Sequence, residues 1–222
     1  MKRILPLLCI ILILLSVCGC DKTPPPDASV MDALQKRHPD SQITFDGILY
    51  SAIEDNVPLS DYEIPPHGHQ LVDGAYYDTV SDIIDALDPE TSVVIRAKKT
   101  GESRQCLVYK NVTRYPHNVY TDMKLDVLEV YYGDVNAGDE IVFRQTFATY
   151  TDDDGAPMNY NFACIPICDD GEYLLVLGEN GDSLYDGATA YMSMDIYMTE
   201  IDLTKPITYD KAQALYDAFI SK

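Results

Sequence analysis

The sequence predicts an α+β chain whose core is mainly β, folded as an antiparallel sandwich or barrel. Short runs rich in β-branched residues recur along the second half of the chain, and clusters of Gly, Asp and Asn separate them. Helical periodicity is found before and after these runs. The chain has neither a sustained alternation of strands with helices nor an internal repeat, so we expect neither a parallel α/β sheet nor a solenoid.

The start of the chain is typical of a secretory signal peptide. Three residues, Met-Lys-Arg, precede an apolar run from Ile4 to Val17, and Gly19 stands directly before Cys20. The run is shorter than the roughly 20 apolar residues of a spanning helix, so a retained membrane anchor is the less favoured alternative. The pattern is similar to a bacterial lipobox, in which cleavage follows Gly19 and a diacylglycerol is attached to Cys20. We expect a signal peptide over residues 1–19 and a lipid-anchored protein facing outside the cytoplasm.

The charge of the chain excludes one large class of partners. There are 36 acidic and 16 basic residues, and loss of the leader takes the formal net charge from −20 to −22 because two basic residues leave with it. A protein with this much negative charge repels phosphate backbones. We therefore expect no nucleic-acid partner and no orientation flat on an anionic membrane. Solubility of an exported protein explains this charge most simply, and cation binding is the alternative.

Three cysteines remain after the leader and the lipidation site are set aside. Cys164 and Cys168 are spaced to close a small disulfide loop, and a bond from Cys106 to either of them is the competing pairing. One thiol stays free in both cases. A C-x₃-C pair without further ligands in register is poor evidence for zinc, so we expect no metal site and no cofactor.

The first part of the mature chain is expected to be a tether followed by an extension. Residues 20–30 are rich in proline and favour an extended spacer. Residues 31–74 form the extension. It begins with a short helix over 31–37, with Ser29 as the N-cap, and continues with a strand over 42–53 and an irregular polar stretch.

The main domain is assigned to residues 75–222. A helix is expected from Asp78 to Leu87, because apolar residues recur there at helical spacing. Strands follow at 92–97, 106–109, 123–132, 140–149, 172–178 and 189–201, and a final helix covers 209–220. The Gly/Asp/Asn turn at 133–139 predicts a hairpin between its flanking strands, and the most apolar strand, 172–178, is expected to be central.

Several segments of this domain resemble a known barrel family. The strings YTDMKLDVLEVYYGD at 120–134, AGDEI at 137–141 and GEYLLVL at 171–177 are similar to the netrin-like and tissue-inhibitor-of-metalloproteinase-like barrel, as it occurs in surface lipoproteins of Gram-positive bacteria. The resemblance covers about residues 76–200. It implies an antiparallel OB-type barrel with a short helix before it and a C-terminal helix. In the animal inhibitors an N-terminal cysteine binds the protease zinc. Cys20 is expected to be acylated here, so the resemblance does not imply protease inhibition.

Catalytic and metal-binding motifs are weak in this sequence. There is no G-x-S-x-G element, and no recognised motif places a His beside a Ser or Cys, so we expect no catalytic residue. His67 and His69 stand in a Pro/Gly-rich loop without further ligands, and we expect a solvated turn. Residues 152–155, Asp-Asp-Asp-Gly, lack the spacing of a calcium loop and predict an acidic turn.

Aromatic residues indicate where a partner would bind. The chain has 17 Tyr and no Trp, and tyrosine combines flat apolar area with a polar tip. OB-like barrels bind ligands on one face and its loops, so the turns around 111–121 and 150–162 are candidates, with Tyr115, His117, Tyr160 and Phe162 facing the ligand. We therefore expect a non-enzymatic interaction module for an envelope protein or a cell-wall glycan. The alternatives are a ligand- or cation-binding lipoprotein serving a transporter and, third, an envelope enzyme.

Overall fold

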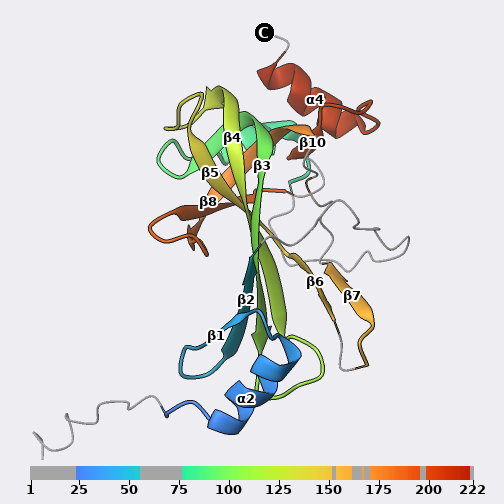
Figure 1. The fold of residues 1–222 in the computed structure, drawn as a ribbon. Coiled ribbons are helices and arrows are strands. Elements are labelled where there is room, and N and C mark those ends of the chain that lie inside the picture. The colour runs from blue at the N-terminus through green and yellow to red at the C-terminus, as the bar shows by residue number, and fades with distance from the viewer. Residues whose placement is uncertain are drawn as a thin grey trace, which may run out of the picture.

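A computed structural model describes residues 24–55, 77–151, 154–161, 171–195 and 199–220, together with Ile167. The fold is mainly β, with a barrel in the upper part of Figure 1 and a second lobe below it. The described elements are α2 Ala28–Arg37, β1 Gln42–Phe45, β2 Tyr50–Asp55, α3 Val80–Asp85, β3 Ser92–Tyr109, β4 Asn118–Tyr132, β5 Glu140–Gln145, β6 Phe147–Thr151, β7 Pro157–Asn161, β8 Glu172–Asp182, β9 Thr189–Ser193, β10 Glu200–Asp202 and α4 Asp210–Phe219.

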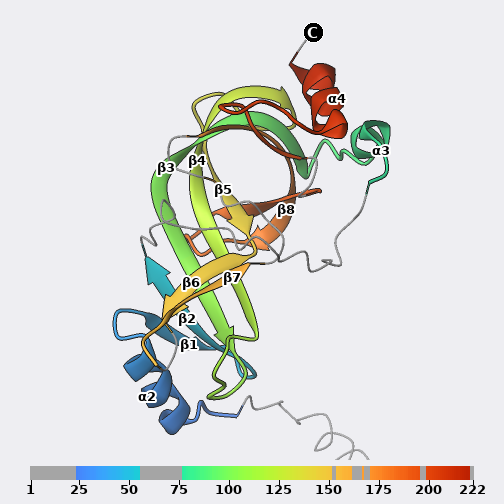
Figure 2. The same ribbon diagram turned by 90° about the vertical axis from the view of Figure 1, so that its right-hand side faces the viewer.

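Five strands close the barrel. Their order is β3-β4-β5-β9-β8, and a second pairing of β3, with β8, completes the circle. All of these pairs are antiparallel except β5 with β9. Figure 2 shows the strands curling around the interior, which inward-facing apolar side chains such as Ile95, Leu125, Phe143 and Leu175 fill. The predicted barrel is therefore confirmed. So is the hairpin β4–β5. The most apolar strand, β8, was expected to be central, and it has neighbours on both edges because it pairs with β3 on one side and with β9 and β10 on the other.

β3 and β4 extend well beyond the barrel as one long ribbon. The prediction of separate strands at 92–97 and 106–109 is wrong, because β3 runs unbroken for 18 residues. Its register against β4 shifts between Lys99 and Ser103, where Gly101 has a φ of 95°. Such a bulge bends a strand and raises its twist. The polar residues at 98–105 that looked like a break thus form the waist where the ribbon leaves the barrel.

The lower lobe is built on the far half of this ribbon. β2 pairs with β3, β1 pairs with β2, and α2 covers the sheet, so that Leu34, Ala52, Leu107 and Tyr150 share one core. The sheet of eight strands therefore runs through both lobes. The predicted boundary between extension and main domain, at 74–75, lies outside the described residues.

Two local predictions for the lower lobe are corrected. The single strand expected over 42–53 is two strands, because the Asp46 carboxylate accepts the N–H groups of Ile48 and Leu49 and closes a turn between β1 and β2. The expected N-cap Ser29 lies inside the first turn of α2. Asp27 is the N-cap, and its carboxylate accepts the Ser29 N–H at 2.9 Å.

The expected helices before the barrel strands and at the C-terminal end are present as α3 and α4, and they pack on the outside of the barrel. α3 begins with a capping box between Thr79 and Asp82. α3, α4 and β10 enclose a third apolar cluster against the outward faces of β3 and β8, with Ile83, Val176 and Leu215 at its centre. The strand expected over 140–149 ends at Gln145. β6 then leaves the barrel and pairs with β7, and this hairpin reaches the lower lobe. The strand expected over 189–201 is likewise split, into β9 and β10.

Candidate binding groove

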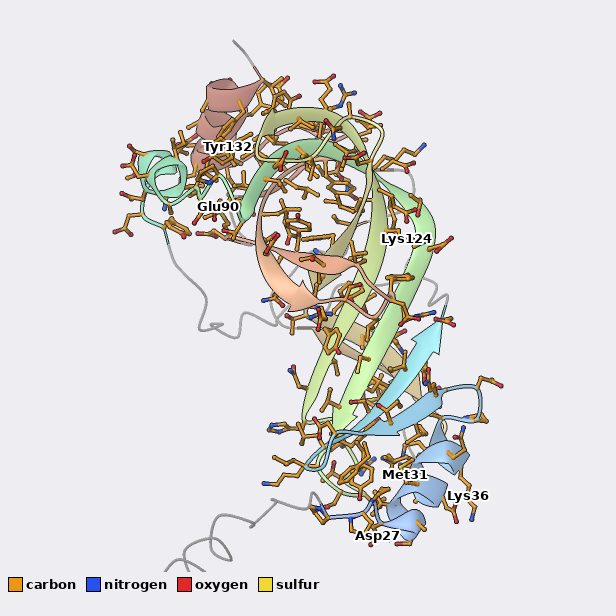
Figure 3. The ribbon with its side chains drawn as sticks, turned by 90° about the vertical axis from the view of Figure 1, so that its left-hand side faces the viewer. Asp27, Met31, Lys36, Glu90, Lys124 and Tyr132 are labelled. Atoms are coloured by element: carbon orange, nitrogen blue, oxygen red, sulfur yellow. The ribbon has the colours of Figure 1, made fainter. Side chains whose placement is uncertain are left out.

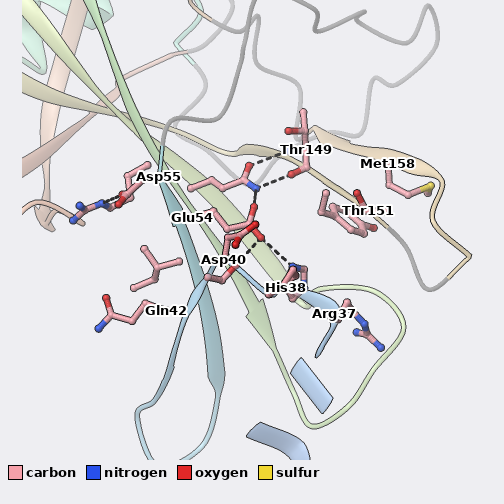
Figure 4. Close-up of a pocket in the computed structure, with 15 residues that line it drawn as sticks. Arg37, His38, Asp40, Gln42, Glu54, Asp55, Thr149, Thr151 and Met158 are labelled. Atoms are coloured by element: carbon pink, nitrogen blue, oxygen red, sulfur yellow. Dashed lines mark hydrogen bonds and ion pairs between the residues drawn. The ribbon is translucent and has the colours of Figure 1, made fainter. Parts of the chain in front are cut away.

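A groove of about 770 Å³ lies in the lower lobe, between the α2–β1 connection, β2, β3 and the β6–β7 hairpin (Figure 4). Its volume is within the range of small-molecule sites in proteins. The lining combines charged, amide and hydroxyl side chains with a few apolar ones. The groove is therefore equipped to bind a polar ligand that also has an apolar face.

The Glu54 carboxylate on β2 is the centre of a hydrogen-bond network in the groove wall. His38 Nδ1 lies 3.0 Å from Oε1, the Ser41 hydroxyl donates to the same oxygen at 2.8 Å, and Gln105 Nε2 donates to Oε2. Burial raises the pKa of Glu54, but the hydrogen bonds from His38, Ser41 and Gln105 outweigh it and leave the pKa below its usual value. Glu54 is thus a carboxylate whose two oxygens are already occupied.

His38 is a bridge between α2 and the sheet. It is 4% exposed, and its Nε2 lies 2.8 Å from the Tyr109 hydroxyl. Since Nδ1 faces the Glu54 carboxylate, Nδ1 is the donor of that hydrogen bond, and Nε2 shares a hydrogen bond with the phenol. Burial raises the pKa of Tyr109 to about 12, so the phenol keeps its proton. Both ring nitrogens are engaged within the protein, and neither is available as a base toward a ligand in the groove.

Gln105 fixes the opposite wall. Its Nε2 donates to the Thr149 carbonyl at 2.6 Å, and its Oε1 accepts the Thr149 N–H at 3.1 Å. The buried Gln105 side-chain amide thus forms one hydrogen bond to the N–H and one to the carbonyl of Thr149, as the backbone of a neighbouring β-strand does. The same amide nitrogen also reaches Glu54, so the two walls of the groove are held at a fixed separation.

The open part of the groove carries side chains with free polar atoms. Asp40, Gln42 and Thr151 line it and are exposed. Ile53 and Met158 add half-buried apolar surface to the lining. In Figure 4, Gln42 lies on one side of the Glu54 network, and Thr151 and Met158 lie on the other.

A second polar cluster joins the groove to the barrel at the waist. Arg104 donates from Nε to Asp55 at 2.5 Å and from Nη1 to the Leu184 carbonyl at 2.6 Å. Its guanidinium also lies 4.9 Å from the centre of the Tyr185 ring, and Lys124 Nζ lies 5.1 Å from the same ring. The β8–β9 turn is therefore held against the ribbon by two cations.

The buried pair Asp122–Arg144 anchors the same turn. Asp122 is fully buried and binds Arg144 through both oxygens, at 2.6 and 2.8 Å, and it also accepts the Leu184 N–H at 2.7 Å. The two side chains face each other in the β4–β5 register. The sequence did not predict this pair, because the expected strand began at Met123 and the observed register places Asp126, not Tyr132, opposite Glu140.

The two sequence-predicted ligand-facing residues whose side chains the structure describes, Tyr115 and His117, are not in the groove. Both are exposed in the turn between β3 and β4. The side chains of Tyr160 and Phe162 lie outside the described part of the chain, as do Gly19, Cys20, Cys164, Cys168 and the histidines at 67 and 69. Cys106 is a buried free thiol, and burial raises its pKa. His38, Glu54 and Gln105 were missed because nothing in their local sequence marks them.

Within the described ranges, no three His, Cys, Asp or Glu side chains are arranged to hold a metal ion. No helix among the described elements is both long and apolar enough to cross a membrane. No protein-family model, curated protein or solved structure matches this chain.

Proposed function

We propose that the protein is a lipid-anchored, extracytoplasmic binding protein whose groove takes a segment of cell-wall glycan. The observation that carries this proposal is the lining of the groove, in which the exposed polar side chains of Asp40, Gln42 and Thr151 occur together with apolar surface from Ile53 and Met158. A sugar ring has hydroxyl groups around its rim and C–H surface on its faces. A wall that mixes acceptors, donors and small apolar areas complements both.

The barrel that adjoins the lower lobe is, in this proposal, an OB-type barrel, and the ligand class of such barrels is carried over to the neighbouring groove. The strand order supports this barrel type: β3 pairs with both β4 and β8, and β5 lies parallel to β9, which gives a closed barrel of five strands. OB-type barrels bind oligonucleotides and oligosaccharides. The formal net charge of −20 disfavours the oligonucleotide and leaves the oligosaccharide.

Binding is favoured over catalysis by the state of His38. A general base needs a nitrogen within reach of the substrate proton. Here one ring nitrogen faces Glu54 and the other faces the buried Tyr109 hydroxyl, so the arrangement holds the wall in place. This supports a non-enzymatic role and assigns the polar network to preorganisation of the groove.

A small polar solute captured for a transporter is the second candidate. The volume of about 770 Å³ favours it, because one small molecule would fill such a site. The two candidates differ in the length of ligand that binds. A glycan extends beyond the groove and gains affinity with each added sugar, whereas a solute does not.

The test is binding of the purified protein to isolated cell-wall glycan and to glycan fragments of increasing length. Asp40→Ala and Gln42→Ala each remove one exposed groove contact and are expected to weaken binding about 2- to 10-fold, the equivalent of one hydrogen bond. Asp134→Ala, an exposed residue in the turn after β4, is the matched control and is expected to bind normally. Equal binding by all three variants would refute the groove as the glycan site. Tight binding of a single small solute with no binding of glycan would favour the transporter candidate.

A further inference from the structure

One end of the lower lobe gathers the chain entry and two hairpin turns. Phe45 pairs with Tyr50, Tyr50 pairs with Tyr109, and Val108 pairs with Asn118, so the β1–β2 turn and the β3–β4 turn lie at the same end of the sheet. The Asp27 N–H donates to the Tyr50 hydroxyl at 3.1 Å, which brings the start of α2 to this end. We call these three parts, residues 24–28, 46–49 and 110–117, the tether end (Figures 1 and 3).

Exposed apolar side chains concentrate at the tether end. Among the described residues, five large hydrophobic side chains are exposed, and three of them lie here: Ile48 is 76% exposed, Val112 is 46% exposed and Tyr115 is 49% exposed. The other two, Ile84 and Tyr209, belong to α3 and the start of α4 on the far side of the barrel (Figure 2). Single exposed apolar residues are ordinary, but three on adjoining turns form a surface that gains by leaving water.

The charge of the β3–β4 turn differs from that of the rest of the chain. Residues 110–117 read Lys-Asn-Val-Thr-Arg-Tyr-Pro-His and contain two cations and no acid, in a chain with 36 acidic residues. The Arg114 guanidinium lies 5.3 Å from the centre of the Tyr115 ring and also donates to the Asp154 carboxylate at 3.1 Å, whereas Lys110, the other cation of this turn, faces solvent. A tyrosine next to a cation combines an apolar ring with a charged group. This combination suits the boundary between acyl chains and headgroups, where the ring can contact the acyl chains and the charge the headgroups.

The tether limits how far this end can be from the bilayer. Six residues, 21–26, separate Cys20 from Asp27. A fully extended chain spans at most about 3.6 Å per residue, so these seven steps reach about 25 Å. If Cys20 carries the lipid, as proposed above, Asp27 stays within that distance of the membrane, and the barrel lies at the opposite end of the molecule from Asp27 (Figures 1 and 3).

We propose that the tether end docks on the phospholipid surface of the membrane that holds the lipid anchor. The turns 46–49 and 110–117 rest in the headgroup region through Ile48, Val112 and Tyr115, with the exposed Lys110 facing lipid phosphates. Arg114 lies beside them and is paired with Asp154. The strongly acidic barrel is then held away from an anionic surface. This inference depends on the proposed lipidation of Cys20 and adds the orientation of the folded body.

The test uses the full chain, produced in a bacterium that processes lipoproteins, with a photoreactive phenylalanine at one position at a time. Ile48 and Tyr115 are replaced in turn, and the matched controls replace Ile84 and Tyr209, which are also an exposed isoleucine and an exposed tyrosine. After illumination of intact cells, positions 48 and 115 are expected to give phospholipid adducts several times more often than 84 and 209. Equal lipid labelling at the four positions, or adducts with protein alone at 48 and 115, would overturn the docking.

The Cys20→Ala variant separates this inference from the anchor itself. If that variant leaves the membrane fraction while wild-type protein with a probe at 115 gives no lipid adduct, the anchor stands and the docking fails. If Cys20→Ala remains in the membrane fraction, Cys20 is not the lipid anchor, and the proposed docking is overturned as well because it depends on that anchor. Release of the variant together with lipid adducts at 48 and 115 in the anchored protein supports both.

Discussion

At the scale of single residues, the Asp122 carboxylate lies where β4, β5 and the β8–β9 turn meet. It is fully buried and accepts three hydrogen bonds, two from Arg144 and one from the Leu184 N–H. Arg144 in turn donates to the Asp182 carbonyl at 3.0 Å and lies 4.2 Å from the centre of the Tyr120 ring. The buried charges of Asp122 and Arg144 compensate each other. Removing one of them would leave the other buried without a partner, which is energetically unfavourable.

Asp122→Ala is expected to lower the free energy of unfolding by about 3–5 kcal/mol, because the Arg144 guanidinium would be left buried and uncompensated. Urea denaturation monitored by circular dichroism measures the change. Asp126→Ala is the control, since Asp126 is an exposed aspartate on the same strand, and its effect should be within about 0.5 kcal/mol. A similar small loss in both variants would show that the buried pair contributes little.

At the scale of elements, α2 closes the core of the lower lobe as a lid over the sheet. Its Val30 and Leu34 are buried against Ala52, Leu107 and other residues of the second cluster. The barrel core shares no residue with this cluster, although β3 and β4 contribute to both. We therefore expect a substitution that weakens the packing of α2 to destabilise β1 and β2 before it destabilises the barrel.

Leu34→Ala is expected to cost about 2–5 kcal/mol, the range for a fully buried leucine cut to alanine. Native-state hydrogen exchange should show faster exchange of the β1 and β2 amides and little change in β8, because local opening follows the cluster that lost its contact. Asp32→Ala, an exposed position of the same helix, is the control. Uniform acceleration in every strand would instead show that the two lobes open only together.

Elements that depend on local sequence patterns could be predicted, and elements that depend on contacts with distant segments could not. The helices and most barrel strands were predicted because periodicity and turn residues are local properties. The length of β3 was not, since its polar waist from Lys98 to Gln105 looks like a loop when β2 and β4 are not known to flank it. The split of residues 42–53 was missed because the turn depends on the Asp46 side chain reaching the amides of Ile48 and Leu49.

At the scale of the whole molecule, two glutamates give the stability of the fold opposite responses to pH. Burial raises the pKa of Glu200 to about 7, with hydrogen bonds from Ser193 and Gln145 opposing it. The pKa of Glu54 is lowered in the folded state. A raised pKa adds stability that is complete below the unfolded value of 4.5 and is lost as the pH rises through 7. A lowered pKa adds stability that is present above 4.5 and is lost as the pH falls.

Glu200→Gln is expected to remove the first of these responses. The amide oxygen can accept from Gln145 while its nitrogen donates to the Ser193 hydroxyl, so the variant keeps both contacts without a titrating proton. Relative to wild type, the variant should gain about 1–3 kcal/mol in free energy of unfolding between pH 4.5 and pH 8, after allowance for partial solvent access. Urea denaturation across this pH range measures it, with the exposed Glu179→Gln as control. An unchanged pH slope in Glu200→Gln would contradict the raised pKa.

The groove shows why a site is harder to predict than the barrel around it. Its walls come from the end of α2, from β2 and β3, and from the β6–β7 hairpin, which are brought together only by the pairing of β2 with β3 and by the contact of Gln105 with Thr149. The barrel needed only the recognition of successive strands. Predicting the groove would have required the pairing register between segments about 50 residues apart. Patterns within a single segment do not contain that information.

The shared ribbon also determines the order in which the chain can fold. β3 and β4 are joined by only eight residues, so the pairing of the two strands that build both lobes carries a small loop-closure cost. α2, β1 and β2 leave the ribosome earlier but have no sheet to join until the far half of β3 exists. β8 and β9 come later and close the barrel on the near half. The β3–β4 hairpin is therefore the natural nucleus, on which the lower lobe assembles from chain made before it and the barrel from chain made after it.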